Sequence, residues 1–235
     1  MKQFRHIALL LTLAACWCGS VWGQTVKQLP EVTSTEGREF FVAWLPNGDR
    51  TPQSPDLRLQ LLASSRKFNN IQVEYPDGTV ESYNINPGET TEIIITPQSV
   101  YWDASAAEEE TPVRKGIRVY SLIDEKFTLY STSQYGSQDV FSLDGAHILP
   151  VEALGTEYMV MNAEGDNTAT EFVLMSTKPG VTHVTINLKV NSRLGNTQQL
   201  SVDLYGSKQI YIVRSMPHDP DDMTTNIDLS GSTIC

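Results

Sequence analysis

The side chains best suited to catalysis are the three histidines that follow the N-terminal segment 1–23, namely His147, His183 and His218. A serine nucleophile needs such a base and a sharp turn that presents it, and no Gly-x-Ser-x-Gly sequence occurs in the chain. His183 lies in a run of alternating apolar and polar residues, where a structural or solvent-facing role is the simpler interpretation. Cys235 has no basic neighbour that would activate its thiol. The sequence therefore predicts a protein that is not an enzyme.

One acidic loop offers ligands for a hard cation. The segment His218–Asp222 brings Asp219, Asp221 and Asp222 close together, and carboxylate oxygens are the ligands that Ca²⁺ prefers. The spacing does not match an EF-hand loop, and Pro220 restricts the backbone. A solvated acidic turn is the simpler interpretation, so no cofactor is expected, and these three aspartates are the candidates if a metal is bound.

Three aromatic residues near turns or strand ends are candidates for ligand binding: Trp44, Tyr101 and Trp102. Exposed aromatic rings stack on sugar faces and anchor protein interfaces. The alternative is that these rings cap the ends of a β-sandwich. Tyr101 and Trp102 are adjacent in a long insert, which makes them the first pair to test.

Residues 1–23 form a targeting segment rather than part of the fold. A basic start precedes the apolar run 7–15, which is too short to span a bilayer. Cleavage after Gly23 would leave Gln24 as the mature N-terminus. The alternative is a bacterial lipobox at 13–16, which would make Cys16 a lipid-anchored N-terminus. Either way the protein is exported, and no later run is long and apolar enough for a transmembrane helix.

Composition narrows the classes of partner. The net charge of the 235-residue chain is −11, so DNA, RNA and anionic lipid are not expected ligands. Cleavage after residue 23 leaves a single cysteine, Cys235, which excludes a disulfide framework. Because 40% of the residues are hydrophobic, a buried core can supply the stability instead.

Short strands would position these residues, and the sequence contains two similar series of such strands. Gly37–Ala43 has an echo at Gly155–Met161, and the two glycines are separated by 118 positions (155 − 37). A similar series of alternating runs and turns follows each copy. Pro76–Thr79, for example, is typical of a hairpin turn, because proline presets φ and glycine accepts a positive φ.

The sequence thus predicts an all-β protein with two tandem immunoglobulin-like sandwiches of antiparallel strands. A lead-in at 24–36 precedes the first sandwich at 37–154 and the second at 155–235. The second copy stops before the equivalent of 121–154, so it is expected to be incomplete, and the natural chain is expected to continue past Cys235.

Five segments together resemble the N-terminal domain of the IgG Fc-binding protein family. They occur in this order: Gly37–Ala43, Asn86–Thr90, Lys115–Val119, Leu149–Pro150 and Leu154–Tyr158. The family includes a mucus-associated animal protein and many secreted bacterial proteins, and the resemblance covers about residues 35–235. It implies a secreted or surface module, here of bacterial type, that continues with a further strand. No binding residue carries over from the family.

We therefore expect an exported recognition or adhesion module that binds a host or matrix protein, or a glycan, at the cell exterior. The alternative is a structural spacer in a larger surface protein. A third possibility, a carbohydrate-active enzyme, requires two carboxyl groups across a cleft, and the sequence pairs no two acids in this way.

Overall fold

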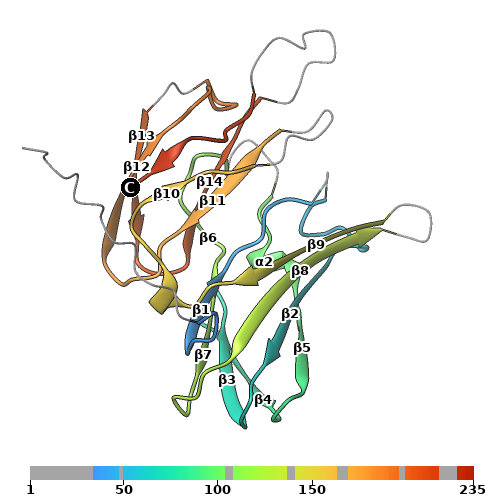
Figure 1. Ribbon diagram of the computed structural model, residues 1–235. Coiled ribbons are helices and arrows are strands. Elements are labelled where there is room, and N and C mark those ends of the chain that lie inside the picture. Colours follow the sequence, from blue (N-terminus) through green and yellow to red (C-terminus); the bar gives the residue numbers. More distant parts are fainter. Residues whose placement is uncertain are drawn as a thin grey trace, which may run out of the picture. The chain divides into compact units, whose positions relative to one another are not determined.

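The computed structural model describes residues 34–47, 50–103, 108–136, 141–162, 169–195, 199–216 and 227–235. These ranges belong to one compact unit, Val32–Cys235. The predicted targeting segment at 1–23 with Cys16, most of the lead-in at 24–36, and the metal candidates Asp219, Asp221 and Asp222 lie outside them. The described residues form four antiparallel sheets with few helical turns, which confirms the predicted all-β sandwich class (Figure 1).

The first half of the chain forms two four-stranded sheets. One sheet has the order β1-β7-β3-β4. Its strands are β1 (Glu39–Val42), β7 (Ile117–Ser121), β3 (Asn69–Glu74) and β4 (Val80–Ile85). The other sheet has the order β5-β2-β8-β9. Its strands are β5 (Thr90–Ile95), β2 (Arg58–Ser64), β8 (Thr128–Gly136) and β9 (Phe141–Ile148). Both sheets contribute to one core, in which Phe40 and Leu61 are fully buried.

The alternation of the sequence determines which face of each strand is buried. In β2, Leu59, Leu61 and Ala63 point into the core while the residues between them are partly exposed. The predicted hairpin at Pro76–Thr79 is confirmed: it joins β3 to β4, and Gly78 adopts a φ of 89°. The turn residues Pro76–Thr79 therefore help to set the register in which β3 and β4 pair.

The second half forms a four-stranded and a three-stranded sheet. The four-stranded sheet has the order β10-β15-β12-β13. Its strands are β10 (Tyr158–Met159), β15 (Thr233–Ile234), β12 (Val181–Asn187) and β13 (Gln199–Tyr205). The three-stranded sheet has the order β11-β14-β6. Its strands are β11 (Glu171–Met175), β14 (Gln209–Arg214) and β6 (Val113–Arg114), so a strand from the first half completes it. The predicted domain division at residue 154 stays a prediction.

The two halves use the same strand order. Strands β10, β15, β12 and β13 occupy the places that β1, β7, β3 and β4 occupy in the first half, and β14-β11 corresponds to β5-β2. Gly88 and Gly206, also 118 positions apart (206 − 88), both adopt a φ of 75° before the strand that follows. One difference remains: β2 pairs with β8 on its second edge, whereas β11 pairs within the described residues with β14 alone.

A third apolar cluster lies between the two sandwiches. Trp102 is fully buried against Ile210 and Ile212 of β14, with Leu45 and Val173 packed around them. The sheet β11-β14-β6 is therefore covered on both faces, by this cluster and by the core of the second sandwich. Trp102 follows the short helix α2 (Pro97–Val100), and the 3₁₀ helix η1 (Val151–Ala153) follows β9.

Candidate functional site

The three aromatic residues predicted to bind a ligand are buried. The exposed fractions of Trp44, Tyr101 and Trp102 are 4%, 0% and 0%. The Trp44 Nε1–H donates to the Thr132 carbonyl at 3.1 Å, and the Tyr101 hydroxyl accepts the backbone N–H of Asn47. The expectation that these rings are exposed is wrong, because the loops that carry them fold into the core. The structure instead favours the alternative in which such rings cap a sandwich: Trp44 and Tyr101 belong to the core of the first sandwich, and Trp102 belongs to the cluster that packs on β14.

The histidines lie apart from one another. His183 Nδ1 lies 2.5 Å from Asp203 Oδ1, across the solvent-facing side of the β12–β13 pair. His147 stacks on Tyr130, with ring centroids 4.5 Å apart and an angle of 17° between the rings. His218 lies outside the described residues. Within the described part of the chain, no group of three or more His, Cys, Asp or Glu side chains is arranged to hold a metal ion.

A groove opens where the sheet of β8 and β9 faces β11, and it encloses about 300 Å³. The residues that line it include Trp44, Leu45, Ser131, Asp144, Glu171 and Val173. Asp144 and Ala146 lie on the side of β9 that faces the groove, and both remain exposed. The groove therefore combines apolar walls with two carboxyl groups that are 27 positions apart in the sequence (171 − 144).

A cluster of buried charges lies behind the groove. Arg214 Nε is 2.9 Å from Glu171 Oε2, and Arg214 Nη1 is 3.5 Å from Glu109 Oε1. Arg193 reaches the same Glu109 oxygen at 3.3 Å, and the Glu109 side chain is only 1% exposed. The Arg214 guanidinium also lies 5.6 Å from the centre of the Trp102 ring. Two arginines thus pair with two buried carboxyl groups, those of Glu109 and Glu171.

Burial raises the pKa of one carboxyl group in the groove, that of Glu171. Removal from water raises the pKa of Glu171 from 4.5 to about 7, and the neighbouring charge of Glu109 acts in the same direction. Arg214 opposes this change without cancelling it. Glu171 is therefore a carboxyl group that titrates near neutral pH in an open groove. No sequence pattern pairs it with Asp144, so sequence reasoning missed both residues.

Three large apolar side chains are exposed at one end of the first sandwich. Phe68, Leu122 and Ile123 are exposed by 49%, 49% and 50%. The backbone N–H of Leu122 donates to the Asn70 carbonyl at 2.8 Å, which places the β7–β8 loop beside the loop that contains Phe68. We refer to Phe68, Leu122 and Ile123 as the apolar tip.

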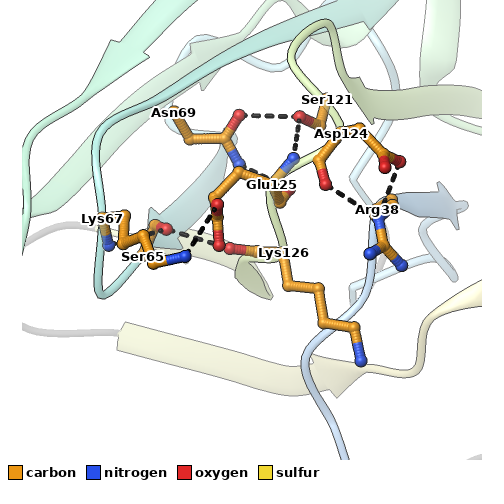
Figure 2. Close-up of polar contacts among 8 residues, drawn as sticks. All are labelled: Arg38, Ser65, Lys67, Asn69, Ser121, Asp124, Glu125 and Lys126. Atoms are coloured by element: carbon orange, nitrogen blue, oxygen red, sulfur yellow. Dashed lines mark hydrogen bonds and ion pairs between the residues drawn. The ribbon is translucent and has the colours of Figure 1, made fainter.

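The loop of the apolar tip is held by polar contacts from beneath (Figure 2). The Ser121 hydroxyl accepts the N–H groups of Ile123 and Glu125 and contacts the side chain of Asn69 at 2.8 Å. The Asn69 amide, which is fully buried, donates to the Glu125 carbonyl at 2.8 Å. The Ser65 hydroxyl donates to the Lys126 carbonyl at 2.9 Å. The loop is thus anchored at three successive points while its apolar side chains face solvent.

Charged residues of both signs surround the apolar tip. Arg38 Nε lies 2.7 Å from Asp124 Oδ1 and also donates to the Asp124 carbonyl. Lys67 Nζ lies 3.2 Å from Glu125 Oε2 (Figure 2). Because these two pairs of opposite charges lie together, they give the surroundings of the apolar tip no strong net charge of either sign. Sequence reasoning missed this site, although an apolar pair followed by Asp-Glu-Lys in a turn is a signal that could have indicated it.

No helix in the part of the chain that the structure describes is long and apolar enough to cross a membrane.

Comparison with known proteins supports the family resemblance. Residues 144–235 match the model of the family described as IgGFc binding protein. The human IgGFc-binding protein is 22% identical over 223 residues, which covers 93% of this chain but only 4% of the human protein. A crystal structure titled Thermotoga maritima 1070 covers 51% of this chain and 98% of its own, at 13% identity and a TM-score of 0.31. The resemblance to the IgG Fc-binding protein family is confirmed by the first two matches.

Proposed function

From the match of residues 144–235 to the IgGFc-binding protein family, we propose that this chain is a protein-recognition module. The named human relative binds the Fc part of immunoglobulin G, which makes a folded protein surface the class of ligand to test first. The module acts outside the cytoplasm, as a secreted or surface protein. Support for export comes from the basic and apolar pattern of residues 1–23.

The observation that carries this proposal is the apolar tip. Protein interfaces commonly have an apolar centre with a polar rim, and a few central side chains supply most of the binding energy. Phe68, Leu122 and Ile123 have this arrangement, with paired charges around them. Because buried Asn69 and Ser65 already hold the loop, little conformational entropy is lost when a partner binds.

Surface plasmon resonance with the Fc fragment of immunoglobulin G tests the proposal. We expect the intact protein to bind, and Leu122→Ser/Ile123→Ser to weaken binding by at least about tenfold, the loss typical of a central apolar contact. Ile94→Ser is the matched control, because Ile94 is 72% exposed on β5 rather than at the tip. Equal affinities for the tip variant and the intact protein would show that the contact lies elsewhere.

A structural spacer is the alternative function. A spacer would bind neither the Fc fragment nor the members of a glycan array, and the tip substitutions would change nothing in either assay. The groove is the place to test the third possibility, a glycosidase, because two carboxyl groups, Asp144 and Glu171, line it. Polysaccharide hydrolysis that is lost in Glu171→Gln would favour this enzyme over both binding functions.

A further inference from the structure

We propose that the outer edge of β5 accepts an extended basic segment of a partner polypeptide, which adds to the sheet antiparallel to β5. Strand addition to an open sheet edge is a recurrent mode of peptide recognition, in which backbone hydrogen bonds supply affinity and side-chain contacts supply specificity. No residue of the apolar tip belongs to β5, so the two sites can be tested separately.

The second sandwich shows how such an edge is filled. Strand β14, which corresponds to β5, pairs with β11 on one edge and with β6 on the other. The Glu110 N–H donates to the Ile212 carbonyl at 3.1 Å, and the Gly116 N–H donates to the Lys208 carbonyl at 3.0 Å. Between these two bonds, both residues of β6 pair antiparallel with β14. The segment 110–116 is therefore an added strand on this edge.

The correspondence between β5 and β14 extends to single residues. Tyr211 lies in the core of the second sandwich as Ile93 lies in the core of the first, and the two are 118 positions apart (211 − 93). The same offset places Ile94 at the position of Ile212, whose carbonyl faces the added strand. Because hydrogen-bonded positions alternate along a strand, residues 90, 92 and 94 carry the N–H and C=O groups that point away from β2.

The outer edge of β5 carries no strand in the described part of the chain. Its residues pair with β2 along Thr90–Ile95, and no second strand pairs with them there. None of the described residues outside this ladder makes a backbone hydrogen bond to residues 90, 92 or 94. The side chains of these three residues are exposed, so an incoming strand can approach them.

One apolar side chain at this edge lacks the cover that its counterpart has. Ile94 is 72% exposed, whereas Ile212 is 1% exposed because the cluster around Trp102 covers it. Val113 of β6 packs on the same cluster and lies opposite Ile210. The partner strand therefore needs an apolar residue on the face that it shares with Ile94, where the two side chains form a cross-strand pair.

Charge complementarity selects a basic partner. Glu92 lies on β5 and Glu89 directly precedes it, and neither makes an ion pair with any described residue. Each accepts a hydrogen bond from a neutral amide, Glu92 from Gln60 and Glu89 from Asn86. A charged residue on an edge strand discourages pairing with strands that do not complement it. A lysine or arginine in the partner strand would be attracted to both carboxylates.

A second copy of this chain fits the edge less well. Its own segment 110–116 is already bound to its β14. Each copy also carries a net charge of −11, so two copies repel each other. The partner is thus a different polypeptide, whose extended segment combines an apolar residue with basic ones, as Val113–Lys115 does.

The probe is a synthetic peptide with the sequence of residues 110–118, blocked at both ends. Site-resolved hydrogen–deuterium exchange of the full chain reports the amides of residues 90, 92 and 94. The amides of residues 208, 210 and 212, which β6 covers, are the internal reference. We expect the first set to exchange faster than the reference in the free protein, and to slow by at least about tenfold with peptide.

Matched variants test the parts of the site. A peptide with Arg114→Glu and Lys115→Glu should bind at least about threefold more weakly at low salt, and this difference should shrink in Glu89→Gln/Glu92→Gln. Peptides N-methylated on alternate amides should lose binding in one of the two phases only, since one set of N–H groups faces β5. Leu122→Ser/Ile123→Ser should bind the peptide unchanged.

Three results would overturn the proposal. Slow exchange of residues 90, 92 and 94 in the free monomer would mean that the chain itself covers the edge. Protection that grows with protein concentration, without peptide, would assign the edge to a second copy. Failure of the peptide to protect these amides at millimolar concentration would mean that the edge does not accept a strand.

Discussion

Lys208 Nζ lies 2.6 Å from Glu74 Oε1, although the two residues are 134 positions apart. The same ammonium group donates to the Tyr75 carbonyl at 2.8 Å, and Lys208 is only 3% exposed. Glu74 belongs to β3 and Lys208 precedes β14, so this ion pair between a buried lysine and a half-buried glutamate joins the two sandwiches. The hydrogen bond from Lys208 lowers the pKa of Glu74 below 4.5.

Removing this lysine should loosen the joined structure. We expect Lys208→Met to lower the free energy of unfolding by about 2 kcal/mol at pH 7. The loss is smaller than for a fully buried pair because Arg118 Nη1 still lies 3.5 Å from Glu74 Oε2. Since the folded pKa of Glu74 is depressed, the contribution is present above pH 4.5 and is lost as the pH falls through the folded pKa. Urea unfolding at pH 7 and in acid measures both effects, and an equal loss at both pH values would contradict them.

Glu171 should give the opposite pH dependence. Its folded pKa is raised from 4.5 to about 7, so between these values the folded state binds more protons than the unfolded state. Stability should therefore fall as the pH rises through this window, by about 3 kcal/mol at most. Unfolding of the intact protein and of Glu171→Gln, measured from pH 4 to 8, tests this.

The Glu171→Gln variant should lose most of this slope, whereas Asp144→Asn, on the exposed side of the groove, should keep it. An unchanged slope in Glu171→Gln would mean that another group titrates.

The repeated Gly-x-Glu segments allow a matched pair of substitutions. A Cβ atom added to Gly37 would collide with the Cβ of Pro150, whereas one added to Gly155 would meet its nearest neighbour at an ordinary 3.9 Å. We expect Gly37→Ala to cost about 1–3 kcal/mol through this overlap. Gly155→Ala should change stability by less than about 0.5 kcal/mol. Thermal unfolding of both variants provides the comparison, and similar losses in the two would show that the contact with Pro150 yields easily.

Trp102 should be essential to the cluster between the sandwiches. The side chain is fully buried, and its Nε1–H has no hydrogen-bond partner among the described residues. Trp102→Ala should cost about 3–5 kcal/mol, because it leaves a cavity beside Ile210 and Ile212. Trp102→Phe should cost clearly less, since it also removes an unsatisfied donor. Chemical denaturation followed by circular dichroism distinguishes this packing role from a ligand-binding role, in which stability would barely change.

Local patterns in the sequence predicted local structure well. The alternation in β2 and the turn at Pro76–Thr79 determine which side chains are buried and where the chain reverses. The similar series of runs after each copy also agrees with the structure, because β15 takes in its sheet the place that β7 takes in the first.

Long-range contacts could not be predicted in this way. Periodicity shows that a face is buried but not what covers it, so it gave no sign that β6 pairs with β14 or that Trp102 packs on that sheet. For the same reason the groove was missed: Asp144 and Glu171 belong to strands of different sandwiches. Trp44 and Tyr101 were expected to be exposed because they lie near turns, but both turn their rings into the core of the first sandwich, and only Trp102 is covered by the second.

The central claim is that this chain recognises a protein through its apolar tip. Hydrogen–deuterium exchange of the full chain, with and without the Fc fragment of immunoglobulin G, tests it most directly. We expect added protection at residues 66–68 and 121–126, and none at β13, whose edge lies in the other sandwich. Protection confined to other strands, or no protection at saturating Fc, would contradict the account.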